Sequence, residues 1–482
     1  MRVLFLHNRL SLEGEPLGLM QLISIVRQAG HEVELTFLHD AYLEACRIFK
    51  PDLLAASVMS SDSGVFTSAL KKIKQAFPSL PVLMGGPHAT FMPNSIESLE
   101  VDALCVGEGD EAILDVLEHI GNRQPLEGCA IPNIISRTSQ NPPRPLVHNL
   151  DVLPFLDRDL IYSKSDTLKH FPLRTFAASR GCPFACTYCF NHSYNALYKG
   201  LGPIVRRRSV ENLIQEIEIV TKSYPTKFIK FADDAFIHRI DDWFIHFSKE
   251  YKSKINIPFY CLLRADVVSE DMVYLLKSAG CTSVCMSIES GSEPLRKNIL
   301  NRNVSNDKII KSFDMFNSAG IKIYTNNLLG LPGSSLQDDF DTLKLNIRCK
   351  PGIGHFTIMT PFPGTKIYTY CEEKNLLPES LKRGKIPSSV GAKSTLTCFS
   401  EKEKRIQRNI AMLGPLVVKF PFLFSIAVKY LFKVPENTFY KFIYFLTKNY
   451  LFKKHIVPVR FPIKLLVKVS ILQIKETVIQ NK

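Results

Sequence analysis

The chain has 482 residues, 45% of them hydrophobic and 22% charged, with a formal net charge of +14. This composition is typical of folded proteins and excludes an intrinsically disordered chain. The length predicts two to four domains, at roughly one per ~150 residues. Its twelve cysteines are too sparse for a secreted disulfide scaffold, so we expect a reducing, cytoplasmic environment.

The first 135 residues alternate short apolar runs with segments of helical periodicity. Buried strands are predicted at 3–6, 33–37, 53–58, 82–84 and 103–106, and helices at 19–29, 41–49, 65–76 and 111–120. The run 3–6 is too short to be a signal peptide. Strands that alternate with helices indicate an α/β domain with a doubly wound, Rossmann-like (flavodoxin-like) parallel sheet.

Glycines follow three of these strands, at the edge where doubly wound sheets bind their ligands. The candidate binding residues are Gly18 after the first strand, Gly85 and Gly86 after the fourth, and Gly107, Glu108 and Gly109 after the fifth. A dinucleotide site is a weaker interpretation, because the third glycine of that fingerprint is missing. A domain that has lost its ligand is the other alternative.

Residues 136–170 contain closely spaced prolines, at Pro142, Pro143, Pro145 and Pro154. Proline at this density interrupts both helices and strands, so the segment is predicted to be a linker. A second domain is then expected from residue 171 onward.

A short loop beyond residue 180 carries Cys182, Cys186 and Cys189 in CxxxCxxC spacing. Such spacing brings three thiolates to one point. Structural zinc sites use four protein ligands, whereas three thiolates leave one iron of a [4Fe–4S] cluster open. The loop therefore predicts an iron–sulfur site, and part of a zinc site is the alternative.

Six further strands are predicted between 171 and 390, at 175–178, 228–232, 259–263, 283–288, 321–329 and 356–359. Helices at 210–221 and 271–278 alternate with them. Polar and glycine residues follow several strands, at the carboxyl ends where barrels place their chemistry. These residues are Asp233, Asp234, Glu289, Ser290, Gly291, Gly330 and Gly333. A turn or a helix cap is the alternative for each of them taken alone.

With Tyr188 just before the third cysteine and the strand-end motifs in this order, residues 1–390 resemble radical S-adenosylmethionine (SAM) enzymes that carry a cobalamin (B12)-binding domain. The resemblance implies a partial (β/α)6 barrel at 171–390, with Cys182, Cys186 and Cys189 holding a [4Fe–4S] cluster. The open iron of the cluster would bind SAM. An electron from the cluster would then cleave SAM and release a 5′-deoxyadenosyl radical.

The resemblance also implies roles for the strand-end residues. Asp233 or Asp234 would accept a hydrogen bond from the SAM ammonium, and Glu289 would hold the ribose hydroxyls. The glycines would let the backbone approach SAM closely. Residues 1–135 would bind cobalamin, although the Asp-x-His-x-x-Gly motif that supplies a histidine to cobalt elsewhere is absent.

The implied reaction is cobalamin-dependent methyl transfer to an unactivated carbon, with an electron donor such as flavodoxin or ferredoxin. A radical cyclase or oxidoreductase, a methylthiotransferase and a non-enzymatic cobalamin or SAM sensor are the alternatives. A methylthiotransferase would need a second cluster, and Cys46, Cys105 and Cys129 are too far apart in the sequence to build one convincingly. Neither the substrate nor a catalytic side chain can be named from the sequence.

Residues 391–482 form a basic, apolar and mainly helical C-terminal region. Residues 411–482 contain twelve lysines and arginines but only two glutamates, so +10 of the net charge lies there. Pro421 and two lysines interrupt the apolar run 416–432, which excludes a membrane-spanning helix. The region is predicted either to dock on the barrel as a helical cap or to lie on an anionic membrane, giving access to an apolar, lipid-like substrate. We expect no nucleic acid partner, because no RNA-binding motif is present.

Overall fold

The computed structural model describes residues 1–8, 15–382 and 393–459. The chain divides into two compact units. One consists of Met1–Phe171 and Phe190–Arg207, and the other of Pro172–Cys189 and the residues from Arg208 onward. The second unit thus includes the C-terminal region, and residues 136–171 belong to the first.

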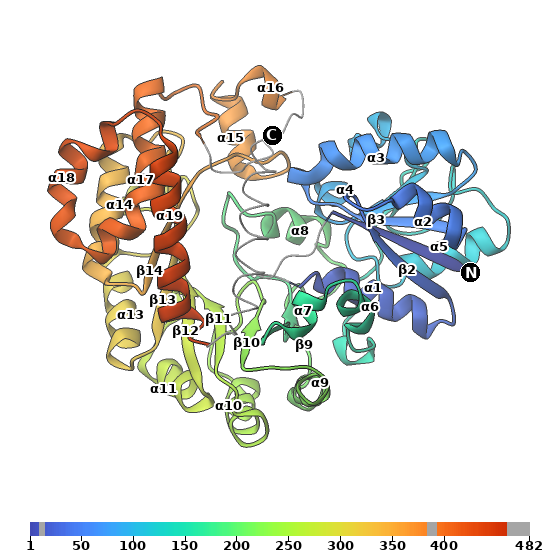
Figure 1. The fold of residues 1–482 in the computed structure, drawn as a ribbon, viewed down its shortest axis with the longest axis horizontal. Helices are drawn as coiled ribbons and strands as arrows, with labels where there is room; N and C mark the ends of the chain where they lie inside the picture. Colours follow the sequence, from blue (N-terminus) through green and yellow to red (C-terminus); the bar gives the residue numbers. More distant parts are fainter. Residues whose placement is uncertain (9–14, 383–392, 460–482) are drawn as a thin grey trace. The chain divides into compact units, whose positions relative to one another are not determined.

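The first unit is built on a six-stranded sheet in the order β2-β1-β3-β4-β5-β6, drawn in blue shades in Figure 1. Its first five strands are parallel, and β6 pairs antiparallel with β5. This order confirms the flavodoxin-like prediction and places the topological switch point between β1 and β3. The strands are β1 (Arg2–His7), β2 (Glu32–Phe37), β3 (Leu53–Ser57), β4 (Val82–Gly85), β5 (Ala103–Cys105) and β6 (Ile134–Ile135).

Helices connect these strands and bury their apolar faces on the sheet. Phe66, Leu70 and Ile73 of α3, for example, pack in one core with Leu4 and Leu54 of the central strands. The helices of this unit are α1 (Leu17–Gln28), α2 (Tyr42–Phe49), α3 (Ser63–Ala76), α4 (Pro87–Phe91), α5 (Ala112–Gly121), α6 (Asp159–Ser163), α7 (Asp166–His170) and α8 (Asn191–Leu197), and the short strand β9 (Arg206–Arg207) follows.

The linker prediction for 136–170 is wrong at its end, where helices α6 and α7 form. Arg158 makes an ion pair of 3.0 Å with Glu15, and both side chains are almost completely buried. The side chain of Ser165 caps α7 by accepting a hydrogen bond from the Leu168 amide. These contacts fold the segment onto its own unit, which the proline content alone did not reveal.

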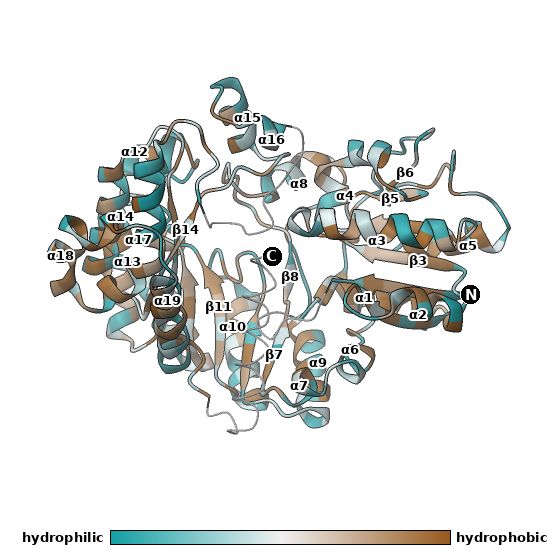
Figure 2. Cartoon of the chain, turned by 45° about the horizontal axis from the view of Figure 1, so that its top comes forward, coloured by the Kyte–Doolittle hydropathy of each residue, from teal (hydrophilic) through white to brown (hydrophobic). Residues whose placement is uncertain are grey.

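The second unit contains a six-stranded parallel sheet in the order β14-β13-β12-β11-β10-β7. Neighbours in this sheet follow the chain, and the two end strands do not pair with each other, so it is an open, partial (β/α)6 barrel. Figure 2 shows brown, apolar colour along much of its strands. The strands are β7 (Leu173–Phe176), β10 (Phe228–Phe231), β11 (Phe259–Leu263), β12 (Cys281–Met286), β13 (Lys322–Leu329) and β14 (Ile353–Ile358), and the short β8 (Ser179–Arg180) follows β7.

Side chains alternate between two unlike faces of this sheet. Residues such as Phe231, Phe259 and Ile323 are fully buried beneath the surrounding helices. Tyr260 and His355, on the other face, are only partly buried. The helices are α9 (Val210–Ser223), α10 (Asp242–Glu250), α11 (Glu270–Ala279), α12 (Glu293–Asn298), α13 (Asn306–Ser318) and α14 (Leu336–Cys349).

The C-terminal region begins with a long helix that packs against the barrel. Helix α17 (Glu401–Lys419) starts at Ser400, which forms a capping box with Glu403. Ile410 and Val417 of α17 lie in one core with Phe356 of β14. The neighbouring helices are α15 (Lys366–Glu373), α16 (Glu379–Lys382), α18 (Phe424–Lys429) and α19 (Thr438–Leu451). Among the helices described, none is long and apolar enough to span a membrane.

Residues 190–207 return to the first unit and hold the loop after β5. Arg206 makes two hydrogen bonds to the carboxylate of Glu108, at 2.9 and 2.7 Å. The hydroxyl of Tyr194 donates a third, at 2.9 Å. The side chains of Arg206 and Glu108 are 1% and 13% exposed, so this ion pair is buried.

We expect Arg206→Met to destabilise the first unit by about 3–5 kcal/mol, because it leaves the Glu108 carboxylate buried without its counter-ion. The double variant Arg206→Met/Glu108→Gln should recover much of that loss. Thermal unfolding followed by circular dichroism measures both effects. The exposed pair of Arg47 and Glu44 provides the control, and Arg47→Met should change stability by less than about 1 kcal/mol. Equal effects of the two single variants would contradict the prediction.

Candidate functional site

The cysteine loop lies in the second unit, directly after β7 and β8. Cys182 and Cys186 are buried and Cys189 is partly buried, and none of the three is in a disulfide. Burial, and after it the nearness of Asp234, Cys189 and Cys186, raise the pKa of the Cys182 thiol to about 11. The three thiols therefore share one neighbourhood. Across the described ranges, no three His, Cys, Asp or Glu side chains converge as a ready metal-binding group.

Arg264 brings a positive charge to this loop. Its Nη1 donates to Cys186 Sγ at 3.2 Å, and its guanidinium lies 3.8 Å from the centre of the Phe184 ring. Asp266 holds the same guanidinium with two hydrogen bonds, at 2.9 and 2.7 Å. The sequence shows only that Arg264 follows a strand; the structure makes it a neighbour of the cysteines. A cation in contact with one of the three thiols fits a site for a cluster held by thiolates.

Tyr188 joins the cysteine loop to the strand-end residue Glu289. The Tyr188 hydroxyl donates to Glu289 Oε1 at 2.6 Å, and Arg302 Nη1 lies 3.2 Å from that hydroxyl and 3.5 Å from the carboxylate. Burial raises the pKa of Tyr188, and the Glu289 charge raises it further, so the phenol remains protonated. Nothing in the sequence pointed to Arg302, which lies in the loop between α12 and α13.

Asp233 and Asp234 occupy unlike positions, although the sequence could not separate them. Asp233 is buried and accepts from the Ala178 amide at 3.1 Å and from the Ser179 hydroxyl. Asp234 is exposed and acts electrostatically on Cys182. Asp233 thus fixes the segment that leads into the cysteine loop, while Asp234 is exposed and its contact with SAM stays a prediction.

The turn after β12 has two unusual backbone positions. Glu289 has a φ of +66°, a left-handed conformation that few non-glycine residues adopt. A Cβ on Gly291 would lie 2.4 Å from the carbonyl carbon of Asp341 in α14. Gly291 is therefore required by its contact with a helix, and its expected approach to SAM stays a prediction. Ser290, between them, is buried.

The turn after β13 is held by the C-terminal region. Gly330 donates its amide to Asp339 at 3.0 Å, and Gln407 of α17 donates to the other oxygen of that carboxylate at 3.1 Å. Burial raises the pKa of Asp339 to about 7. A Cβ on Gly333, by contrast, would meet no atom within 4 Å. Gln407 is remote from this turn in the sequence, which is why sequence reasoning missed it.

The six residues predicted to bind cobalamin also divide into two groups. The hydroxyl of Tyr198 occupies the space where Gly107 would carry a Cβ, and Glu108 is held by Arg206. A Cβ on Gly86 would lie 2.8 Å from the amide nitrogen of Val58, so this glycine is needed within the fold. A Cβ on Gly18 would have no atom within 4 Å. A Cβ on Gly85 or Gly109 would meet its nearest atoms at ordinary van der Waals distances. Packing therefore does not require glycine at these three positions, and their contact with cobalamin stays a prediction.

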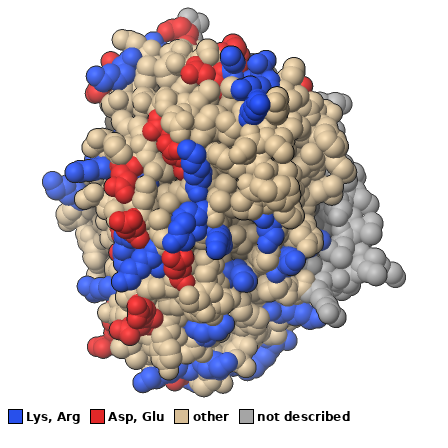
Figure 3. Space-filling view, turned by 90° about the vertical axis from the view of Figure 1, so that its left-hand side faces the viewer, with Lys and Arg blue, Asp and Glu red and all other residues tan. Residues whose placement is uncertain are grey.

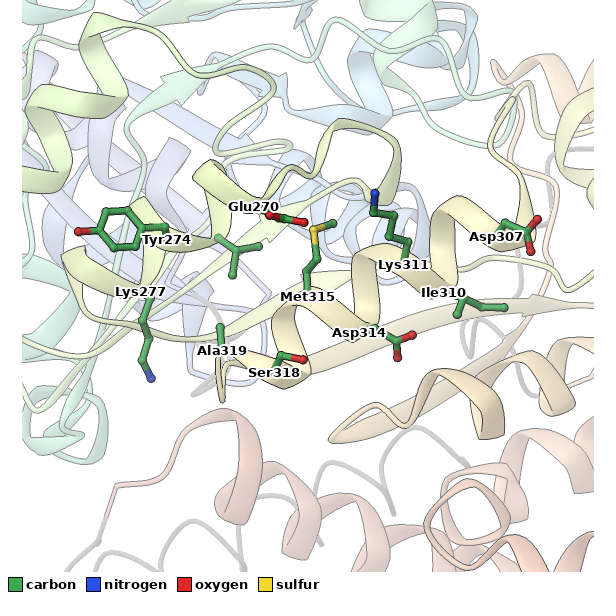
Figure 4. A pocket seen from close by; sticks show the side chains of 11 residues that line it. Glu270, Tyr274, Lys277, Asp307, Ile310, Lys311, Asp314, Met315, Ser318 and Ala319 are labelled. Carbon is green, nitrogen blue, oxygen red and sulfur yellow. The ribbon is translucent and has the colours of Figure 1, made fainter.

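A groove of about 670 Å³ lies between the outer helices α11 and α13 (Figure 4). Tyr274, Lys277 and Met315 are among its lining residues. It contains none of the predicted site residues. We assign no function to it.

Comparison with known families agrees with this geometry. The model of the radical SAM superfamily matches residues 177–345, and that of the B12 binding domain matches residues 5–117. The chain is a radical SAM enzyme with a B12-binding domain. SAM, a [4Fe–4S] cluster and cobalamin are the cofactors of these families, which confirms the cofactors expected from the sequence. The residues that hold them stay predictions.

Two relatives and one solved structure show what this radical SAM enzyme is similar to. An uncharacterised methyltransferase of Pyrococcus horikoshii is 28% identical over 379 residues, which cover 76% of this chain and 80% of the relative. The hopanoid C-3 methylase of Methylococcus capsulatus is 26% identical over 381 residues, covering 75% of this chain and 69% of the relative. The cobalamin-dependent SAM radical enzyme OxsB shares the fold, with a TM-score of 0.67, 15% identity and coverage of 98% of this chain and 75% of OxsB.

Asp233 should make stability depend on pH. Burial raises its pKa from 3.8 to about 6 in the folded chain. The folded state therefore binds a proton more tightly than the unfolded state, and the resulting stabilisation, about 3 kcal/mol, is present below pH 4 and lost as the pH rises through 6. The difference in stability between Asp233→Asn and the unmodified chain should follow this profile when thermal unfolding is measured between pH 4 and 7. The exposed neighbour supplies the control: if Asp234→Asn gives the same profile, the assignment to Asp233 is wrong.

Proposed function

We propose that this enzyme methylates an unactivated carbon of a small, apolar or lipid-like substrate, using SAM, a [4Fe–4S] cluster and cobalamin. The observation that carries the proposal is the contact of Tyr188 with Glu289 and Arg302, which links the CxxxCxxC loop to the strand-end residue expected to hold SAM. The two methylating relatives support methyl transfer, and the hopanoid methylase supports a lipid-like substrate.

The chain's own residues would hold and orient the cofactors. Cys182, Cys186 and Cys189 would bind the cluster, with Arg264 providing positive charge beside it. Asp234 would accept from the SAM ammonium, while Glu289 and Ser290 would face its ribose and Gly330 and Gly333 its adenine. When bound, the cluster and SAM supply a carbon-centred radical, and cobalamin supplies the methyl group.

The cobalamin would lie at the carboxyl ends of β1, β3, β4 and β5 in the first unit, near Gly18, Gly85 and Gly109. Radical cyclisation or oxidoreduction uses the same cofactors and remains the second candidate reaction. Methylthiolation needs a further cluster, and a sensor would have no need of a loop with three intact cysteines. The electron would come from a small carrier such as flavodoxin or ferredoxin.

The test is one incubation of anaerobically reconstituted enzyme with methyl-labelled SAM, hydroxocobalamin and a low-potential reductant. We expect both 5′-deoxyadenosine and S-adenosylhomocysteine, because radical methylation consumes SAM in both ways. The variant Cys182→Ala/Cys186→Ala/Cys189→Ala should lose bound iron and all 5′-deoxyadenosine. Cys398→Ala, which changes an exposed cysteine outside the loop, should retain both.

The products distinguish the candidate reactions. If 5′-deoxyadenosine forms without S-adenosylhomocysteine, cyclisation or another radical reaction replaces methyl transfer. If the triple variant keeps its iron, the cluster assignment fails.

We further propose that the C-terminal region holds the enzyme on an anionic membrane surface. Helix α17 docks on the barrel, but α18 and α19 present an outer apolar surface. Four residues at helical spacing form a stripe on α19: Phe439, Phe442, Leu446 and Tyr450, all of them exposed. Phe422, Ile426 and Tyr430 form a second stripe along α18 and its flanks, and Phe422 is 74% exposed. Exposed aromatic residues in this number favour a partner surface.

Basic residues accompany both stripes. Seven lysines stand between 419 and 454, against the single acidic residue Glu436. The lysine ammonium groups of Lys429 and Lys454 lie 5.1 and 5.3 Å from the ring centres of Tyr430 and Tyr450. On the side of the second unit where α18 lies, Figure 3 shows wide uncharged areas with lysine and arginine among them. This pairing of apolar stripes and lysines suits the interface of an anionic bilayer.

Vesicle co-sedimentation tests this contact. The enzyme should bind vesicles that contain anionic lipid, and binding should weaken but persist in high salt, because apolar insertion is not screened. Phe422→Ser and Phe439→Ser should each weaken binding by about tenfold. This factor corresponds to the free energy gained when a phenylalanine side chain is buried. Tyr274→Ser, on an equally exposed residue of the outer helix α11, should leave binding unchanged. Failure to bind anionic vesicles at low salt would refute the membrane contact but not the reaction.

A further inference from the structure

Arg264 stands at the carboxyl end of β11, directly after its last residue, Leu263. Its guanidinium contacts two residues of the cysteine loop. The guanidinium carbon lies 3.8 Å from the centre of the Phe184 ring, and Nη1 donates to Cys186 Sγ at 3.2 Å. Among the described residues, Arg264 alone donates a hydrogen bond to the Cys186 sulfur. A charged donor therefore meets a predicted cluster ligand directly.

Asp266 fixes the orientation of this guanidinium. Its carboxylate accepts from Nε of Arg264 at 2.9 Å and from Nη2 at 2.7 Å, the two-pronged geometry that an arginine offers to a carboxylate. Burial alone would raise the pKa of Asp266, but the hydrogen bonds and the charge of Arg264 lower it, so this carboxylate is ionised at neutral pH. Cys186 thus meets the nitrogen of the guanidinium that the carboxylate does not occupy.

Water shields this ion pair only weakly. The side chains of Arg264 and Asp266 are 11% and 27% exposed, and charges that are removed from water act on their neighbours more strongly than charges at the surface. Arg302 also acts electrostatically on Cys186, but its hydrogen bonds go to other groups, Glu289 among them. The charge of Arg264 is therefore the one that touches the thiol.

We propose that Arg264 is a positioning residue that raises the reduction potential of the [4Fe–4S] cluster by stabilising negative charge on Cys186 Sγ. The proposal rests on the proposed function, in which Cys186 holds the cluster. One electron passes from the low-potential carrier to the cluster, and no covalent bond forms or breaks, so the reduced site carries one more negative charge. A cation that donates to a cluster sulfur stabilises this more negative state, and hydrogen bonds to the sulfurs are among the factors that set such potentials.

The two members of the ion pair should shift the potential in opposite directions. Arg264→Met removes both the donor and the positive charge, so the ratio of reduced to oxidised cluster at a fixed potential should fall by about tenfold, or about 59 mV for one electron. Asp266→Asn retains the arginine and removes the negative charge that offsets it, so the potential should rise. Loss of support for the cysteine loop would not give opposite signs for two residues that hold each other.

Potentiometric titration of the anaerobically reconstituted enzyme tests this role without substrate, cobalamin or turnover. Titanium(III) citrate sets the potential, and electron paramagnetic resonance measures the reduced cluster. The midpoint potential is a property of each cluster, so incomplete loading of a variant does not shift it. Arg348→Met is the control and should leave the potential unchanged. This exposed arginine pairs with Asp314 near the end of α14, just before β14 begins, and so lies at the amino ends of the strands.

The proposal is overturned if Arg264→Met leaves the potential unchanged or raises it, or if Asp266→Asn lowers it. If Arg264→Met holds no cluster at all, the sign of the shift in Asp266→Asn decides. Calorimetric titration with SAM on the same preparations tests the competing role, because a loss of SAM affinity without a change of potential would make Arg264 a SAM ligand instead.

The same samples separate this inference from the proposed function. If the unmodified enzyme gives no signal of a reduced cluster, the proposed function and this inference both fail. If it forms 5′-deoxyadenosine and S-adenosylhomocysteine while Arg264→Met and Asp266→Asn share its potential, this inference alone fails.

Discussion

Buried carboxylates hold the loops at the carboxyl ends of the strands in both units. Asp233 fixes the segment before the cysteine loop, Glu289 holds Tyr188, and Asp339 holds the turn at Gly330. Glu108 does the same for the loop after β5 in the first unit. A carboxylate is costly to remove from water unless donors surround it, so each one specifies a single arrangement of its loop. The strand ends are therefore organised before any cofactor binds.

The contacts of these residues distinguish those that support the site from those that do not. Asp233 is occupied by backbone and hydroxyl donors, whereas its neighbour Asp234 is exposed near Cys182. Gly291 similarly serves its contact with α14, while Gly333 leaves open space. The adjacent residues Asp233 and Asp234 thus take unlike positions, one buried and one exposed.

The C-terminal region contributes to the second unit at several points. Gln407 of α17 completes the turn after β13, and Tyr444 of α19 reaches His355 on the inner face of the sheet. The outer side of α19 carries the stripe that begins at Phe439. One amphipathic helix therefore faces the barrel with one side and solvent with the other, which makes a docked cap and a membrane contact compatible.

The sequence by itself determined the two α/β sheets, because apolar periodicity and strand-end glycines are local properties that a chain displays directly. It also determined the CxxxCxxC loop and, through that loop, the enzyme family. It did not determine helices α6 and α7, since proline content hid a segment that Arg158 and Glu15 fold onto the first unit. Only the tertiary structure decided the roles of Arg264, Arg302, Gln407 and Tyr444. These side chains act on partners that are remote in the sequence, and such contacts depend on the packing of whole elements rather than on any local pattern.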